Sequence, residues 1–339
     1  MQDNLGETAW DELRETRWHP PGAASADRVR AATYVSALEQ AEQMFRAAAV
    51  VGTSTRPLQV FYGLSQAGRA IAAASTLQEW ELKGHGIASI NLSTDLPSVG
   101  VATDKPSSAG SFVRLSALLG SPVWGKTPVP LNELWDTLPE NERAPLADRG
   151  SARRTPLWME DRDLWDEPHP LVSVPVVGFP PRFGQGNVDR AMLDGYLAAF
   201  PGARDYHNYV NVQRDPDLPA MTVHVDGWSE LTMNWQVQDG TSVDSATRLK
   251  YLRSMSHSYL GQLYFFPTVG ANVATLHPLM TWWAVLHTLS MLARYQPGEW
   301  ATHIDVDASR YATPIERLLR RALHVVPRLV LETLRQVTP

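Results

Sequence analysis

The feature that most constrains the fold of this chain is a long helical pattern at each end, with a different pattern between them. Over residues 26–51 apolar side chains recur every three or four positions, so that Tyr34 and Phe45 share one face of a helix. The same period returns over residues 276–295 and 314–337. Each of these helices has an apolar face that must be covered, so we expect the two ends of the chain to pack together.

The middle of the chain, from about residue 87 to residue 240, has the pattern of short strands. Alternating or β-branched runs are separated by clusters of Pro, Gly, Asp and Ser, which are typical of turns. One helix is expected there, over residues 187–200, and the charged stretch 139–168 is expected to be a surface excursion. The expected strands cover residues 88–92, 98–103, 171–177, 220–225 and 231–237.

Together these patterns predict an α+β fold, in which N-terminal and C-terminal helices form a helical body and a β-rich middle segment is inserted between them. We expect three parts, residues 1–86, 87–240 and 241–339, and the third packs with the first. Helical character returns with a helix expected over residues 245–263.

Several local features bear on where the helices begin and end. Ser25 or Asp27 can cap the first long helix, because either side chain can accept a hydrogen bond from a free amide of the first turn. Residues 57–75 fit either one buried helix or a strand over 58–62 that turns into a helix. Pro327 is expected to kink or divide the last helix, because proline lacks the amide hydrogen.

Charge and cysteine content exclude several classes of function. The chain has 36 acidic and 30 basic residues, a formal net charge of −6, so no overall basic field attracts nucleic acid or an anionic membrane. It has no cysteine, which excludes disulfides, a thiolate nucleophile and thiolate-bound zinc or iron-sulfur clusters. No glycine-rich phosphate loop occurs, and we expect no cofactor.

The sequence also indicates where the protein is found. The first thirty residues are polar and contain no apolar stretch of the kind that a secretory signal needs. The most apolar segment, residues 276–293, is interrupted by His277, Pro278 and His287, so it is too short to cross a bilayer. We therefore expect a cytoplasmic protein that does not bind a membrane.

Three blocks of sequence carry a family resemblance. LQVFYGLSQAGRAIAAA at 58–74 is followed by KGHG at 83–86, AGSF stands at 109–112, and a third block runs from His277 to Pro297 with Trp300 after it. In this combination the chain resembles the YaaC-like family of bacterial cytoplasmic proteins, over most of its length. The resemblance implies a mixed helical protein with a helical C-terminal part, and it assigns neither a reaction nor catalytic residues. The expected function is therefore a non-catalytic interaction or regulatory component, with a protein partner or a homodimer formed through the helical body.

Arg294 is the residue that we single out as a candidate ligand-binding group. It closes an apolar helix next to Tyr295, whose ring can stack on a guanidinium. One interpretation is an anion or phosphate site formed with His85. The alternative is a buried capping arginine that is paired with an acid such as Glu299.

A second hypothesis is a ribonuclease of the HEPN type, acting on RNA in stress or phage defence. Arg317 and His324 have the spacing of the arginine and histidine in that superfamily's motif, with six residues between them. The arginine would bind phosphate, and the histidine would orient the 2′-hydroxyl or protonate the leaving oxygen. Chance alone produces such pairs in a chain this rich in arginine, so the spacing carries little weight.

A third hypothesis is a serine hydrolase. Residues 63–68, GLSQAG, resemble a nucleophile elbow if the residues before them form a strand, and Ser65 would then be the nucleophile. His257, His277 or His287 would have to act as the base. The mainly helical 57 residues that precede this segment argue against an α/β-hydrolase.

No metal is expected, although one segment has suitable side chains. In an extended strand, His303, Asp305 and Asp307 would lie on the same side and could hold a hard divalent cation. We interpret this segment as an exposed polar strand or loop.

Overall fold

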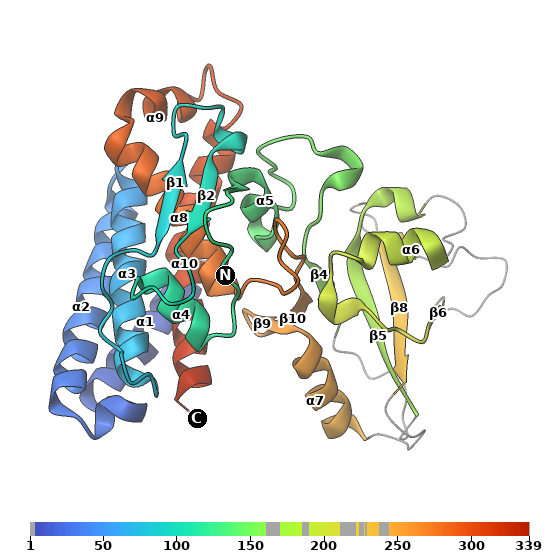
Figure 1. The fold of residues 1–339 in the computed structure, drawn as a ribbon, viewed down its shortest axis with the longest axis horizontal. Helices are drawn as coiled ribbons and strands as arrows, with labels where there is room; N and C mark the ends of the chain where they lie inside the picture. The colour runs from blue at the N-terminus through green and yellow to red at the C-terminus, as the bar shows by residue number, and fades with distance from the viewer. Residues whose placement is uncertain are drawn as a thin grey trace. The chain divides into compact units, whose positions relative to one another are not determined.

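The structure is a computed structural model that describes residues 4–160, 170–184, 190–210, 222–223, 227, 229–236 and 244–338. Its helices and strands form two compact units (Figure 1). The first unit comprises residues 1–153, 269–272 and 276–339, and the second comprises residues 154–268 and 273–275. The first unit is mainly helical, and the second is built on a sheet.

The helices of the first unit begin and end for local reasons. The helix expected over residues 26–51 starts at Asp27, whose carboxylate accepts hydrogen bonds from the amides of Val29 at 2.7 Å and Arg30 at 3.1 Å. Residues 57–75 form one helix with Pro57 in its first turn, so the strand alternative is wrong. The helices are α1 (Asn4–Trp18), α2 (Arg28–Val50), α3 (Arg56–Ala74), α4 (Ser111–Leu118), α5 (Leu131–Asp136), α8 (Pro278–Tyr295), α9 (Pro297–His303) and α10 (Ala312–Val337).

The two ends of the chain share one apolar core, as expected. α1 packs on α10, and α3 packs on α2, α8 and α10; the blue and red parts of the ribbon lie side by side (Figure 1). The rings of Phe61 and Trp283 meet edge to face with centroids 6.1 Å apart. Gly68 allows this approach, because a Cβ at that position would lie 2.6 Å from the Trp283 ring. The α+β fold with a shared helical body is therefore confirmed.

The last helix does not divide. α10 continues through Pro327, which is buried inside it. The division expected there is wrong, because the apolar face of α10 on both sides of the proline is buried in the core and outweighs one missing backbone hydrogen bond.

A small antiparallel sheet belongs to the helical unit. It consists of β1 (Ile87–Ile90), β2 (Gly100–Thr103) and β3 (Val129–Pro130), in the order β1-β2-β3. Ile87 pairs with Thr103, and the first strand packs on α8. The strands expected at 88–92 and 98–103 are thus present, each displaced by one or two residues.

The second unit is built on a larger antiparallel sheet with the strand order β6-β8-β5-β4-β10-β9, and β7 pairs with β8. The helices α6 and α7 belong to it, and its core includes Val174, Tyr196 and Trp235. Residues 187–189, 220–221, 224–225 and 237 of the expected elements lie outside the described residues. The elements are β4 (Leu157–Met159), β5 (Leu171–Phe179), α6 (Arg190–Leu197), β6 (Asn208–Val210), β7 (Thr222–Val223), β8 (Ser229–Gln236), α7 (Ser245–Met255), β9 (His257–Tyr259) and β10 (Gln262–Phe265).

The helix expected over residues 245–263 ends early. α7 stops at Met255, and the rest forms the hairpin of β9 and β10. The turn between these strands contains Leu260 and Gly261, with φ angles of +54° and +84°, which lie outside the helical region. The strand β10 also pairs with β4, and this long-range pairing overrides the local helical pattern.

The boundaries of the two compact units differ from the boundaries expected at residues 86/87 and 240/241. The strands β1 to β3, which begin at residue 87, lie with the helices, and α7, β9 and β10 lie with the second sheet. The division falls after Arg153, and the chain re-enters the first unit at Val269. Packing partners decide this, because β1 covers α8 whereas β10 extends the second sheet.

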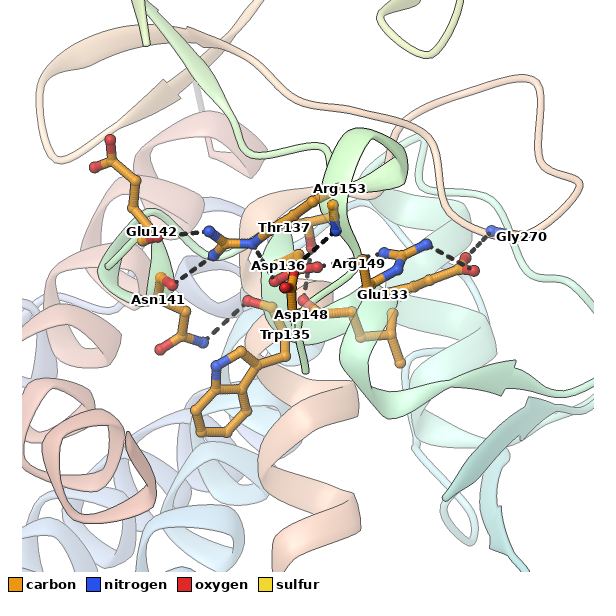
Figure 2. Close-up of polar contacts among 12 residues, drawn as sticks. Glu133, Trp135, Asp136, Thr137, Asn141, Glu142, Asp148, Arg149, Arg153 and Gly270 are labelled. Atoms are coloured by element: carbon orange, nitrogen blue, oxygen red, sulfur yellow. Dashed lines mark hydrogen bonds and ion pairs between the residues drawn. The ribbon is translucent and has the colours of Figure 1, made fainter. Parts of the chain in front are cut away.

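Inside the first unit, two of the segments next to a crossing between the units, at Arg153 and at Gly270, are held on α5 (Figure 2). Asp136, with a side chain only 2% exposed, accepts hydrogen bonds from Arg153 at 2.9 Å and from Arg149 at 3.3 Å. One turn earlier, Glu133 accepts from Arg149 at 3.3 Å and from the amide of Gly270 at 2.9 Å. The chain therefore leaves the first unit and returns to it beside the same short acidic helix.

Candidate functional site

The loop formed by Gly84–Gly86, between α3 and β1, has unusual backbone bonding. All three of its carbonyl oxygens accept a hydrogen bond from a backbone amide. The donors are Ser111 for Gly84 at 3.2 Å, Phe112 for His85 at 2.9 Å and Asp104 for Gly86 at 3.0 Å. In contrast, the three amides of this loop have no hydrogen-bond partner among the residues that the structure describes. Gly86 is buried against Gly110, whereas Gly84 and His85 are exposed. Unbonded amides next to left-handed residues are an arrangement that binds anions, so the amides of Gly84 and His85 are the candidates here.

Glycine is required in this loop. Gly84 and Gly86 have φ angles of +68° and +71°, which residues with a Cβ rarely adopt. Gly110 lies so close that a Cβ there would be 2.3 Å from the Cα of Gly86. The loop therefore rests directly on the start of α4, and its carbonyls serve as the cap that α4 lacks from a side chain.

Helix α3 presents a polar face beside this loop. Tyr62, Ser65, Gln66 and Arg69 follow the spacing i, i+3, i+4 and i+7, so they share one face, and all four are half-buried. The guanidinium of Arg69 donates one hydrogen bond to the carbonyl of Leu82 at 3.2 Å, which ties the loop to α3. Most of its donors remain available, because a guanidinium has five N–H groups.

Arg294 reaches the same face from the last turn of α8. Its guanidinium donates to the hydroxyl of Tyr62 at 2.5 Å and lies 5.0 Å from the centroid of the Tyr295 ring. Its side chain is exposed, and it forms no ion pair with Glu299. The alternative of a buried capping arginine paired with an acid is therefore wrong.

The electrostatics of this face are positive and uncompensated. Neither Arg69 nor Arg294 forms an ion pair with a carboxylate in the described part of the chain. The imidazole of His85 lies within the field of both. Burial, then Arg294, then Arg69 lower the pKa of His85 below its ordinary value. This face therefore holds two fixed positive charges and a neutral imidazole at pH 7.

His287 of α8 lies behind His85, with the two ring centroids 5.7 Å apart. Its Nδ1 is 3.3 Å from the hydroxyl of Ser89, and its ring packs on Phe61 at 5.2 Å. Burial, with a smaller contribution from His85, lowers the pKa of His287 to about 3. This histidine is neutral at physiological pH and is too weak a base to activate a nucleophile.

The structure brings some of the expected site residues together. His85, Arg294 and Tyr295, expected as an anion site, lie in one region of the first unit. Arg69 and Tyr62 are not among the residues expected from the sequence. Their signal was present, because both belong to a polar row at helical spacing in an otherwise apolar helix.

The blocks that carry the family resemblance meet at this face. α3 contains the first block, the Gly84–Gly86 loop follows it, residues 109–112 support that loop, and α8 contains the third. We refer to Tyr62, Arg69, the Gly84–Gly86 loop and Arg294 together as the anion face.

The serine hydrolase hypothesis requires a nucleophile elbow at Ser65, and the structure contains none there. Ser65 lies inside α3, without the strand-to-helix turn that exposes a nucleophile. No described contact joins it to a histidine. His287 contacts Ser89 instead, His277 caps the first turn of α8 through its Nδ1, and His257 belongs to the second unit.

The proposed ribonuclease pair lies on α10. Arg317 and His324 are seven residues apart, so they share one face two turns apart, and both are half-buried. His324 packs under α1, where a Cβ at Gly6 would lie 3.1 Å from its Nδ1. No described contact links the arginine with the histidine, and the pair remains a prediction.

The segment that could have held a metal is not an extended strand. His303 is the last residue of α9, and Asp305 accepts a hydrogen bond from the amide of Asp307 within a turn. The strand geometry expected for this segment is therefore wrong. Among the described residues no group of three or more suitable side chains could hold a metal ion.

The comparisons with known proteins gave one match. A family model described as YaaC-like Protein matches residues 8–334, which cover both compact units. No curated protein and no solved structure matches the chain. No helix of the described chain is both long and apolar enough to span a membrane.

Proposed function

The chain belongs to the YaaC-like protein family, and from this premise and the anion face we propose that it is a non-catalytic regulatory component that binds a small anion. The ligand lies against α3, the Gly84–Gly86 loop and α8. Association with a protein partner or a second copy of the chain through the helical body, in the cytoplasm, is part of the same proposal.

The observation that carries the proposal is a pair of guanidiniums with no carboxylate to balance their charge. Several arginines of the first unit face carboxylates, as Arg14 does with Glu42 at 3.0 Å and Arg153 with Asp136 at 2.9 Å. Others, such as Arg30, instead use their guanidinium groups on several backbone carbonyls. On the anion face the guanidiniums of Arg69 and Arg294 have no carboxylate partner in the described residues, and the amides of the exposed Gly84 and His85 have no hydrogen-bond partner there. Both guanidiniums act on the ring of His85, so an anion bound beside that ring would interact favourably with two positive charges.

The same geometry favours binding over catalysis. The groups on the anion face are hydrogen-bond donors, and the nearest buried histidine, His287, is neutral and occupied by Ser89. A nucleophile needs a base within hydrogen-bond distance, and Ser65 has no such contact in the described structure. The anion face can therefore bind an anion, but its described residues do not provide a nucleophile and a base in contact that could catalyse a reaction of that anion.

Thermal unfolding in the presence of anions tests this proposal. Phosphate, sulfate and acetate are compared with chloride at equal ionic strength, for the wild type, Arg69→Gln and Arg294→Gln. The control is Arg320→Gln, which removes an exposed guanidinium of α10 that is paired with Glu316. At ten times its Kd, an anion stabilises the folded protein by about 1.4 kcal/mol.

We expect that stabilisation to raise the melting temperature of the wild type by about 3–6 °C for a unit of this size. The arginine control should show the same rise, whereas Arg69→Gln and Arg294→Gln should lose most of it. If no anion stabilises the wild type more than chloride does, the anion face is not a binding site.

A further inference from the structure

We propose that the ligand of the anion face is the phosphate group of a phosphate monoester, bound as a dianion, and that His85 takes up a proton when it binds. This inference rests on the proposed function and names its ligand class. It also makes binding dependent on pH.

The charge and the number of donors favour phosphate over a carboxylate. A phosphate monoester carries a charge of about −1.5 to −2 at pH 7 and presents three acceptor oxygens. The two guanidiniums of Arg69 and Arg294 match that charge, and a carboxylate would neutralise only one of them. The donors also come from three separate elements, α3, the loop and α8, which suits an acceptor with several oxygens better than a planar group with two.

The surroundings of His85 explain why its protonation is coupled to the ligand. The ring packs on Phe61 of α3, with centroids 5.8 Å apart. The charged groups that act on it are Arg69 from α3 and Arg294 from α8, and the titratable ring of His287 lies behind it. In its own loop Lys83 and Glu81 are exposed.

Partial burial and the guanidiniums of Arg294 and Arg69 disfavour the imidazolium form of His85. A bound dianion reverses the sign of the local field, because it neutralises both arginines and attracts a third positive charge. An opposite charge within 4–6 Å typically raises the pKa of such a group by about 1–3 units. His287 does not compete for this proton, because its ring is buried and bonded to Ser89.

Isothermal titration calorimetry with two kinds of probe tests both parts of the inference. Methyl phosphate is the ligand analogue, and acetate represents carboxylates. Sulfate serves to count protons, because it is a tetrahedral dianion that does not itself titrate near neutral pH. Titration at pH 6.5 in two buffers of different ionisation enthalpy gives the number of protons that the protein takes up.

We expect methyl phosphate and sulfate to bind at least tenfold more tightly than acetate. We expect sulfate binding at pH 6.5 to be accompanied by proton uptake, and a pKa shift of about one unit allows at most about 0.5 proton. His85→Gln should bind sulfate more weakly and without proton uptake. His207→Gln, at an exposed histidine of the second unit, is the matched control and should behave like the wild type.

The outcomes separate this inference from the proposed function. Binding of sulfate without proton uptake, or uptake that persists in His85→Gln, refutes the role of His85 while the anion face stands. Equal affinity for acetate refutes the phosphate assignment, and no binding of any probe refutes the proposed function itself. If His85→Gln does not fold, the imidazole Cε1–H signal of His85 in the wild type reports the same proton by NMR, and a signal that sulfate leaves unchanged refutes the coupling.

Discussion

His287 makes the helical unit sensitive to acid, and the size of the effect follows from its burial. Its pKa falls from the ordinary 6.5 to about 3 in the folded protein. Below pH 6.5 the unfolded chain therefore binds a proton that the folded chain does not, and folding loses stability as the pH falls from 6.5 towards 3. From these two pKa values the loss is about 2 kcal/mol at pH 5 and about 3 kcal/mol at pH 4.

Other histidines contribute in the same direction, so the prediction is stated for a difference between variants. Burial is the first cause that lowers the pKa of His85, His257 and His303 as well. His287→Gln removes only the contribution of position 287 and keeps a polar side chain beside Ser89. Between pH 7.5 and pH 5 this variant should lose about 2 kcal/mol less stability than the wild type does.

Hydrogen exchange measured by mass spectrometry is the appropriate assay, because peptides from α8 report on the first unit alone. The opening free energy of residues 278–295 is compared at the two pH values for the wild type, His287→Gln and the control His207→Gln. The control should have the pH dependence of the wild type. Equal losses in the wild type and in His287→Gln would refute the assignment of the acid sensitivity to this buried ring.

Two further predictions concern α5 and α10. Asp136→Asn leaves two guanidiniums around a buried neutral group, so it should lower the free energy of unfolding by about 2–4 kcal/mol in urea titrations. The control Asp11→Asn, at an exposed ion pair, should lower it by less than about 1 kcal/mol. Equal losses in the two variants would contradict a structural role for this buried network. Arg317 does not contact His324 in the described structure, and the anion face lies elsewhere. We therefore expect that neither the wild type nor Arg317→Ala/His324→Ala cleaves tRNA. Cleavage by the wild type that the double substitution abolishes would establish the ribonuclease instead.

Much of the fold could be predicted because its elements are marked locally. The sequence shows Asp27 at the start of a helix and the apolar rows of α2, α8 and α10. Each of these apolar rows must be covered by another element in a compact fold. The anion face was predicted in part. Arg294 stood out at the end of an apolar helix, whereas Arg69 lay inside a helix whose identity the pattern alone left open.

The sequence by itself determined the long helices of α2, α8 and α10, the apolar faces that these helices must cover, and the family, because these depend on patterns of side chains along the chain. Only the tertiary structure decided that residues 58–62 are helical, that 257–263 form a hairpin and that the first three strands lie with the helices. Such choices depend on which distant surface covers an apolar face. The anion face has the same origin, since Arg69, His85 and Arg294 become neighbours only when α3 and α8 pack around Phe61 and Trp283.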